Sequence, residues 1–366
     1  MHNRALQPTA IATIDAPFDG WPFWVSGNIL GPYARNAAFA FRQYDGEGNF
    51  VQANNVRTNN LGWVASLDYP IEKAPNEFRV AFIGDSLTAS ITNEVPWVTV
   101  AQRELQRAVG RPVLLMNLGV PGLGPARMKM ITLPVAQRLR ADLVVVNLVI
   151  EGMAFLSDPP VEGPRPKPAS IGGALIDFNC QNDRSRAPCN FVPVWTVSAG
   201  RQLGRVELAT IKAEASRIAA WKSVLVPSLL VFAPSPATGG NLHTVGEVSG
   251  ASPDEQEDGT IHSLQAMRRS YPNLIVTINP LAWYYDPATT PPQLRSFKSR
   301  ARAARLDVID MRERMPEPPA NVGAEWYNLP HDGHWNDAGA ELYGRAMARL
   351  LAERVPELAD SSLAHW

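Results

Sequence analysis

The chain of 366 residues contains little cysteine, no excess of charge of either sign and no long apolar run. Its formal net charge is -1, from 34 Lys and Arg against 35 Asp and Glu. This balance gives no support for binding to nucleic acid or to an anionic membrane surface. The longest apolar stretch, residues 143–156, is interrupted by Asn147 and Glu151, which indicates a buried strand and its exit. We therefore expect no nucleic-acid partner and no membrane span in this chain.

The only two cysteines, Cys180 and Cys189, lie close together in a polar stretch rich in turn-forming residues. A disulfide that closes this loop would stabilise the fold by about 2.5–3 kcal/mol on a chain-entropy estimate. Two unrelated thiols are the alternative, but reduced cysteines are more often buried in apolar surroundings. No signal peptide is visible, yet this loop leads us to expect an extracytoplasmic protein, periplasmic or secreted. Two thiols without neighbouring histidines do not complete a zinc site, so no metal is expected.

The composition changes along the chain in a way that suggests its organisation. Residues 1–77 are rich in aromatic and turn-forming residues without a long helical period, which predicts an N-terminal extension packed on the main domain. From Phe78 onward, strand-like and helix-like segments alternate. A proline-rich stretch opens an inserted excursion, at about 157–225, which holds both cysteines. Residues 357–366 form a tail.

The strand-like segments predict a parallel sheet covered by helices on both faces. Residues 228–234 and 274–280 both resemble a fourth core strand, and the second fits better because a helix-like and a strand-like segment follow it. Three segments are apolar on both faces, as covered parallel strands are: 78–85, 113–119 and 142–150. Helical signals occur in three places: 96–110, 125–140 and from Asn336 onward. Repeated alternation of this kind indicates an α/β fold with right-handed crossovers.

Candidate catalytic groups follow these strands, where functional groups gather in open α/β sheets. Ser86 comes directly after the first buried strand, a position where serine is more often an ordinary helix cap than a nucleophile. A nucleophilic serine needs a base that takes its proton and a carboxylate that orients this base. His334 and Asp332 provide both just before the last helix, with His331 as an alternative base. Backbone N–H groups at Ser86 and in the glycine-rich turn 117–124 are candidates for binding an oxyanion.

These segments resemble the sequence blocks of the SGNH/GDSL hydrolase superfamily. Residues 84–87, Gly-Asp-Ser-Leu, are similar to the first block, whose serine is the nucleophile. Asn-Leu-Gly-Val-Pro-Gly is similar to the second block and places the oxyanion glycine at Gly122. Asp-Gly-His-Trp-Asn is similar to the last block, which implies His334 as the base and Asp332 as its partner.

The Asp-x-His-Trp form resembles that of members acting on acylated bacterial polysaccharides, including O-acetyltransferases, and residues 57–63 are more weakly similar to those members. The resemblance covers roughly residues 55–155 and 270–352 and leaves the excursion unmatched. It implies a flavodoxin-like three-layer α/β/α SGNH-hydrolase fold with a parallel central sheet over residues 78–356. It also implies an acylated carbohydrate or a small ester as substrate.

The third block departs from the family pattern. The family ends this strand with an asparagine that donates to the oxyanion, whereas this chain has Glu151. An ionised carboxylate would repel an oxyanion, and the loss of one donor costs about 2.7–4 kcal/mol in comparable sites. Three explanations stay open: Glu151 points away or is protonated, a donor such as Asn147 takes its place, or the protein is weak or inactive.

Two other features have plainer explanations. The glycines at 119, 122 and 124 occur in the wrong order for a dinucleotide-binding loop, so no cofactor is expected. The acidic run at 254–258 lacks the spacing of calcium ligands and predicts a solvated loop.

We therefore predict a serine-dependent carbohydrate esterase or O-acyltransferase that forms an acyl-enzyme at Ser86 and acts on a glycan ester such as an acetyl group. The alternative is a catalytically silent glycan-binding or polysaccharide-assembly protein that keeps the fold.

Overall fold

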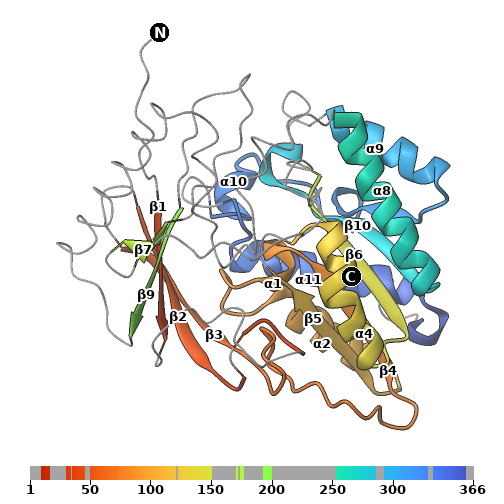
Figure 1. Cartoon of the computed structure of the whole chain (residues 1–366), viewed down its shortest axis with the longest axis horizontal. Coiled ribbons are helices and arrows are strands. Elements are labelled where there is room, and N and C mark those ends of the chain that lie inside the picture. Colours follow the sequence, from red (N-terminus) through yellow and green to blue (C-terminus); the bar gives the residue numbers. More distant parts are fainter. Residues whose placement is uncertain are drawn as a thin grey trace.

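The chain forms two sheets, of which one is parallel and five-stranded and the other is mixed and six-stranded (Figure 1). Among the described residues, none of the helices has the length and apolar character that crossing a membrane requires. The computed structural model describes the following residues: 10–16, 30–33, 35–45, 50–120, 123–150, 170–171, 174–176, 193–199, 253–285, 292–328 and 333–359.

The five-stranded sheet is the core of the α/β part. Its order is β11-β10-β6-β4-β5 and every neighbouring pair is parallel. When these five strands are numbered in chain order and read across the sheet from β5, they give the 2-1-3-4-5 order of flavodoxin-like folds, which confirms the predicted fold class. Residues 274–280 do supply the fourth strand, whereas 228–234 lie outside the described residues. The strands are β4 (Phe78–Gly84), β5 (Val113–Gly119), β6 (Leu143–Leu148), β10 (Leu274–Ile278) and β11 (Val308–Asp310).

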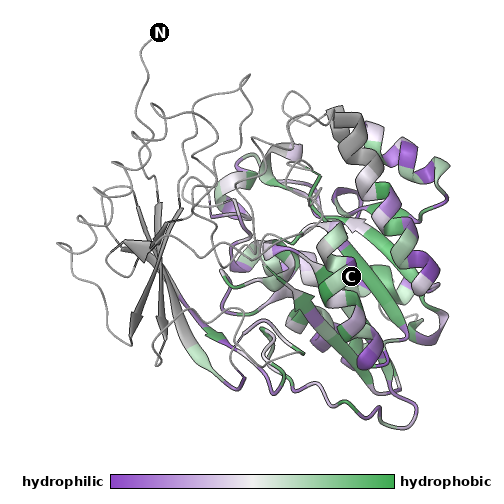
Figure 2. Cartoon of the chain, in the orientation of Figure 1, coloured by the Kyte–Doolittle hydropathy of each residue, from purple (hydrophilic) through white to green (hydrophobic). Residues whose placement is uncertain are grey.

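Helices enclose this sheet in two layers. In one layer α2 packs against α11, and in the other α8 contacts α3 and α9. Right-handed crossovers explain this division, because the chain reverses its direction across the sheet after β5. Figure 2 shows apolar strands inside and polar residues on the outer helices. The helices are α1 (Ser86–Ala89), α2 (Trp97–Ala108), α3 (Pro125–Arg127), the π-helix η1 (Met128–Thr132), α4 (Leu133–Arg138), α8 (Pro253–Ser270), η4 (Ala282–Tyr285), α9 (Pro292–Ala303), η5 (Met311–Glu313), α10 (Val322–Glu325), α11 (Asp337–Arg354) and η6 (Pro356–Leu358).

The acidic run at 254–258 does not form the predicted loop. It lies in the first turns of α8, directly after the first helical residue, Pro253. Carboxylates are favourable there because the amino end of a helix carries a partial positive charge.

The six-stranded sheet combines the N-terminal extension with part of the excursion. Its order is β3-β2-β1-β9-β8-β7, with β1 and β9 parallel and the other pairs antiparallel. Figure 1 shows this sheet beside the α/β part. The extension and the excursion thus share a sheet that is separate from the five-stranded one. These strands are β1 (Ala10–Ala16), β2 (Ala38–Asp45), β3 (Phe50–Arg57), β7 (Ser170–Ile171), β8 (Ala174–Ile176) and β9 (Pro193–Ala199).

Residues 57–63 form a tight turn after β3. Gly62 has φ 84°, in the left-handed region that favours glycine. The Asn59 side chain accepts hydrogen bonds from the backbone N–H groups of Leu61 and Trp63, each at 3.0 Å. The Trp63 indole is buried and donates to the carbonyl of Leu30 at 2.6 Å. These contacts give the segment a role in packing the core.

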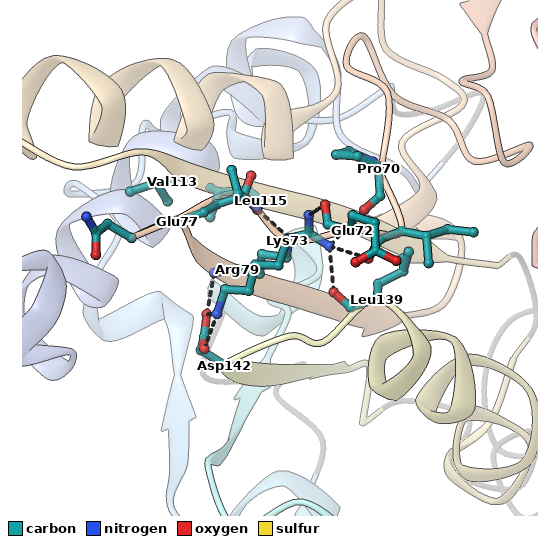
Figure 3. Close-up of polar contacts among 12 residues, drawn as sticks. Pro70, Glu72, Lys73, Glu77, Arg79, Val113, Leu115, Leu139 and Asp142 are labelled. Carbon is teal, nitrogen blue, oxygen red and sulfur yellow. Dashed lines mark hydrogen bonds and ion pairs between the residues drawn. The ribbon is translucent and has the colours of Figure 1, made fainter.

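A buried arginine holds the amino end of the sheet (Figure 3). Arg79, near the start of β4, is 0% exposed, and its Nε donates to Glu77 at 2.6 Å. The carboxylate of Asp142 accepts from the Arg79 backbone N–H at 2.7 Å. The guanidinium also donates to the carbonyls of Pro70, Glu72 and Leu139. This network ties the segment before β4 to the end of the strand that lies opposite Ser86.

Candidate active site

Ser86 lies at the carboxyl end of β4, where the strand order reverses between β4 and β6. Ligand sites of open α/β sheets occur at this kind of switch point. Every residue from Phe78 to Asn93 is buried except Ser86, which is partly exposed. Ser86 is therefore the one partly accessible residue in a segment that is otherwise core.

The preceding residue, Asp85, caps the helix that Ser86 begins. Its side chain accepts a hydrogen bond from the backbone N–H of Leu87 at 3.0 Å, which satisfies one free donor of the first turn of α1. The Asp85 side chain is buried, and burial raises its pKa to about 6. The hydrogen bond from Leu87 and the positive charge of His334 act in the opposite direction on this pKa.

Helix α1 packs very closely on the ends of β4 and β5. A Cβ atom on Gly84 would lie 2.0 Å from Thr88 Oγ1, and one on Gly119 would lie 2.3 Å from the backbone nitrogen of Ala89. Asn117 completes this packing, because its Nδ2 donates to the Ala89 carbonyl at 3.3 Å and its Oδ1 accepts from Gly119 N at 3.0 Å. The glycines of the first two blocks therefore allow the close approach of α1.

His334 lies in a turn that is fixed from both sides. The His334 carbonyl accepts from Asn328 N at 3.0 Å, and the Asn336 side chain caps α11 by accepting from Gly339 N at 2.9 Å. Asn93, which follows α1, donates through Nδ2 to the Trp335 carbonyl at 2.9 Å across 242 positions of sequence. The loop that follows the helix of the predicted nucleophile thus contacts the turn that holds the predicted base.

A set of stacked aromatic side chains supports both loops. Trp335 stacks on Tyr327 with ring centroids 4.3 Å apart and lies 5.4 Å from Tyr343. Tyr343 meets Trp97 edge to face at 4.9 Å, and Trp97 Nε1 donates to the Leu87 carbonyl at 3.0 Å. Because all these rings are buried, they form a rigid connection between the turn of His334 and the helix of Ser86.

The sequence left open that Asn147 donates to the oxyanion in place of the third-block asparagine. The structure instead places its side chain inside the core. It is 0% exposed, its Nδ2 donates to Thr88 Oγ1 at 3.2 Å, and its Oδ1 accepts from the Thr277 hydroxyl. A side chain enclosed in this way is not positioned to reach a substrate oxygen. This placement speaks against Asn147 as a replacement for the third-block asparagine.

Several predicted residues lie outside the part of the chain that the structure describes, and their roles stay predictions. They are Gly122, Glu151, Asp332, the alternative base His331 and the pair Cys180 and Cys189. Within the described ranges, no group of three or more His, Cys, Asp or Glu side chains is arranged to hold a metal ion.

Comparison with known proteins adds to this description. No family model and no curated protein matches the sequence. Similar solved structures include the lipase/acylhydrolase from Enterococcus faecalis, 13% identical over 76% of this chain and 96% of that one, with a TM-score of 0.38. A protein from Desulfitobacterium hafniense described as lipolytic and of the G-D-S-L family is 12% identical over 75% and 99%, with a TM-score of 0.37. The acetyl xylan esterase AlAXEase is 11% identical over 74% and 98%, also with a TM-score of 0.37.

The fold class follows from the strand order described above.

Proposed function

We propose that this protein transfers acyl groups through Ser86, as a carbohydrate esterase or an O-acyltransferase. The observation that supports the proposal is the partly exposed Ser86 in an otherwise buried segment, with the loop after its helix hydrogen-bonded to the residue that follows His334. A hydroxyl at a helix start and an imidazole near it are the two parts that acyl transfer needs first.

The reaction proceeds in two steps, acylation of Ser86 and deacylation. Ser86 Oγ attacks the ester carbonyl while His334 takes the serine proton, and the tetrahedral intermediate collapses as His334 returns that proton to the departing alcohol. Water or a sugar hydroxyl then attacks the acyl-enzyme while His334 takes its proton, and His334 returns this proton to Ser86 Oγ as an acid or a new ester leaves. In the roles that the sequence predicts, Asp332 orients His334, and the N–H groups of Ser86 and Gly122 bind the oxyanion.

A fluorophosphonate probe tests the proposal directly, because it labels only an activated serine. We expect wild-type protein and the control Ser66→Ala, which alters an exposed serine, to be labelled. Ser86→Ala should lose the label, and His334→Ala should slow labelling by at least 10³-fold. An unlabelled wild type would instead favour the silent glycan-binding alternative.

Glu151 is the feature that argues for weak activity. Its replacement tests whether its charge lowers turnover. If its charge opposes the oxyanion, Glu151→Asn should raise turnover of p-nitrophenyl acetate by roughly 10²-fold. An unchanged or lower rate would remove this explanation. Product analysis with acetylated xylan, alone and with a sugar acceptor, then separates hydrolysis from transfer.

We further propose that the protein works outside the cytoplasm with Cys180 and Cys189 joined. Oxidising compartments are where such loops persist. Mass spectrometry of unreduced peptides should show one cross-linked pair, and two alkylated thiols would refute it.

A further inference from the structure

We propose that Asn54 is a positioning residue through which the six-stranded sheet holds the loop that follows the helix of Ser86. This loop, residues 90–94, is the junction loop. The Nδ2 of Asn54 donates a hydrogen bond to the carbonyl of Thr92 within it. The effect on catalysis rests on the proposed function, whereas the contact itself is a property of the fold.

Asn54 lies on the covered face of an edge strand. β3 ends the strand order of its sheet, and Figure 1 shows it on the side that faces the α/β part. Side chains along a strand point alternately to its two faces. Asn54 and Val56 are 6% and 2% exposed, whereas Asn55 and Arg57, which point the other way, are exposed. A buried amide is costly to leave without a partner, so the folded protein keeps the bond to Thr92.

The junction loop begins on the helix of Ser86. The backbone N–H of Ser90 donates to the Ser86 carbonyl at 3.0 Å, and the Ser90 side chain donates to the Leu87 carbonyl at 3.2 Å. Ser90 also has φ 54°, a left-handed conformation that serine rarely adopts and that persists only where its surroundings hold it. A displacement of the loop is therefore transmitted to the backbone of Ser86.

The same loop ends on the turn of His334. Asn93 Nδ2 donates to the Trp335 carbonyl at 2.9 Å, and Thr92, the residue before it, accepts from Asn54. Thr92 and Asn93 are both buried. The junction loop is thus bonded to α1, to the turn of His334 and to the six-stranded sheet, and the bond from Asn54 fixes its middle.

A second buried amide joins the extension to the same helix. Asn117, on β5, is 2% exposed, and its Nδ2 donates to the Val64 carbonyl at 3.0 Å and to the Ala89 carbonyl at 3.3 Å. Val64 follows the turn after β3, and Ala89 ends α1. The extension is therefore bonded to α1 through Asn117 and to the junction loop through Asn54.

Asn54→Leu removes the donor with little change in side-chain shape. The first readout is hydrogen exchange of the whole protein, measured by mass spectrometry on a peptide that spans the junction loop. We expect this peptide to exchange roughly 5-fold faster than in wild type, because the loss of one buried hydrogen bond eases local opening by about that factor. Two matched controls keep the bond from Asn54 and should leave the exchange unchanged: Asn55→Leu on the exposed face of β3 and Val56→Ala on its buried face.

The second readout is the maximal rate of fluorophosphonate labelling at saturating probe. Asn54→Leu should lower this rate by roughly 10–10²-fold, because misplacement of reacting groups by about 1 Å has an effect of that size. Both controls should label at the wild-type rate. A variant that is only less stable would lose labelled protein and keep the rate of its folded fraction. Circular dichroism verifies folding, and Asn54→Ser, whose side chain is too short to keep the bond, takes the place of Asn54→Leu if the latter does not fold.

Unchanged exchange in Asn54→Leu, or an equal acceleration in Val56→Ala, would overturn the role of Asn54. Faster exchange with an unchanged labelling rate would overturn it as well, since the bond would then hold the loop without placing Ser86. If wild type is not labelled, the proposed function fails and the catalytic role of Asn54 fails with it, while hydrogen exchange still decides whether Asn54 holds the junction loop.

Discussion

Replacing Gly119 with alanine should displace the helix that begins at Ser86. The added Cβ would lie 2.3 Å from the backbone nitrogen of Ala89 and 2.6 Å from the carbonyl carbon of Thr88, where ordinary contact begins at 3.4 Å. Relief requires that α1 or the end of β5 shift by roughly 1 Å, because both contacts are with backbone. Overpacking of this kind costs about 1–3 kcal/mol, which lowers the melting temperature by roughly 2–12 °C for a domain of this size.

The effect on chemistry should exceed the effect on stability, because a misplacement of roughly 1 Å can cost about 10²-fold in rate. Thermal unfolding by circular dichroism and the rate of fluorophosphonate labelling at a temperature where the variant is folded measure the two effects separately. Gly110→Ala is the matched control, since Gly110 precedes the same strand and a Cβ there meets nothing within 4 Å. The reasoning fails if Gly119→Ala melts and labels like Gly110→Ala.

Three other predictions concern stability. Arg140 is exposed and has φ 55° after α4, so Arg140→Gly should raise the free energy of unfolding in urea by about 1 kcal/mol; no gain would contradict this. Arg79→Met leaves the mostly buried Glu77 carboxylate without its partner, so the free energy of unfolding should fall by about 3–5 kcal/mol. Labelling of Ser86 in the folded variant should stay unchanged, because Arg79 lies at the other end of β4. Burial raises the pKa of Asp85 to about 6 from its ordinary 3.8. The folded state therefore holds this proton more tightly than the unfolded state, and the protein loses stability as pH rises from about 4 to 6. Asp85→Asn should therefore gain stability relative to wild type across that interval, by up to about 3 kcal/mol, and a constant difference in urea denaturation from pH 4 to 7 would refute it.

The α/β core was predictable because its strands are local and apolar on both faces. Residues 78–84 and 113–119 carry this pattern without interruption, and both form fully buried strands. The helix from Asn336 was also predictable, because asparagine is a preferred residue before the first turn of a helix. In the structure the Asn336 side-chain oxygen accepts from Gly339 N. The acidic run at 254–258 was wrongly predicted as a loop, because acidic residues are equally typical of solvated loops and of the first turns of helices.

Long-range contacts could not be predicted in the same way. The hydrogen bond from Asn93 to the Trp335 carbonyl depends on how two loops meet that are 242 positions apart in the sequence. The polar ends of Asn147 are paired with Thr88 and Thr277, on segments far from it in sequence. Neither pairing leaves a periodic signal within one segment.

The parallel pairing of β1 with β9 has a consequence for synthesis of the chain. Ala10 pairs with Pro193, so the ribosome adds about 180 residues before this strand meets its second neighbour. At about 5–20 residues per second, one edge of β1 stays open for roughly 10–40 s. An open strand edge is a template for pairing with other chains, so the nascent N-terminal half is the stage at which a chaperone would matter most.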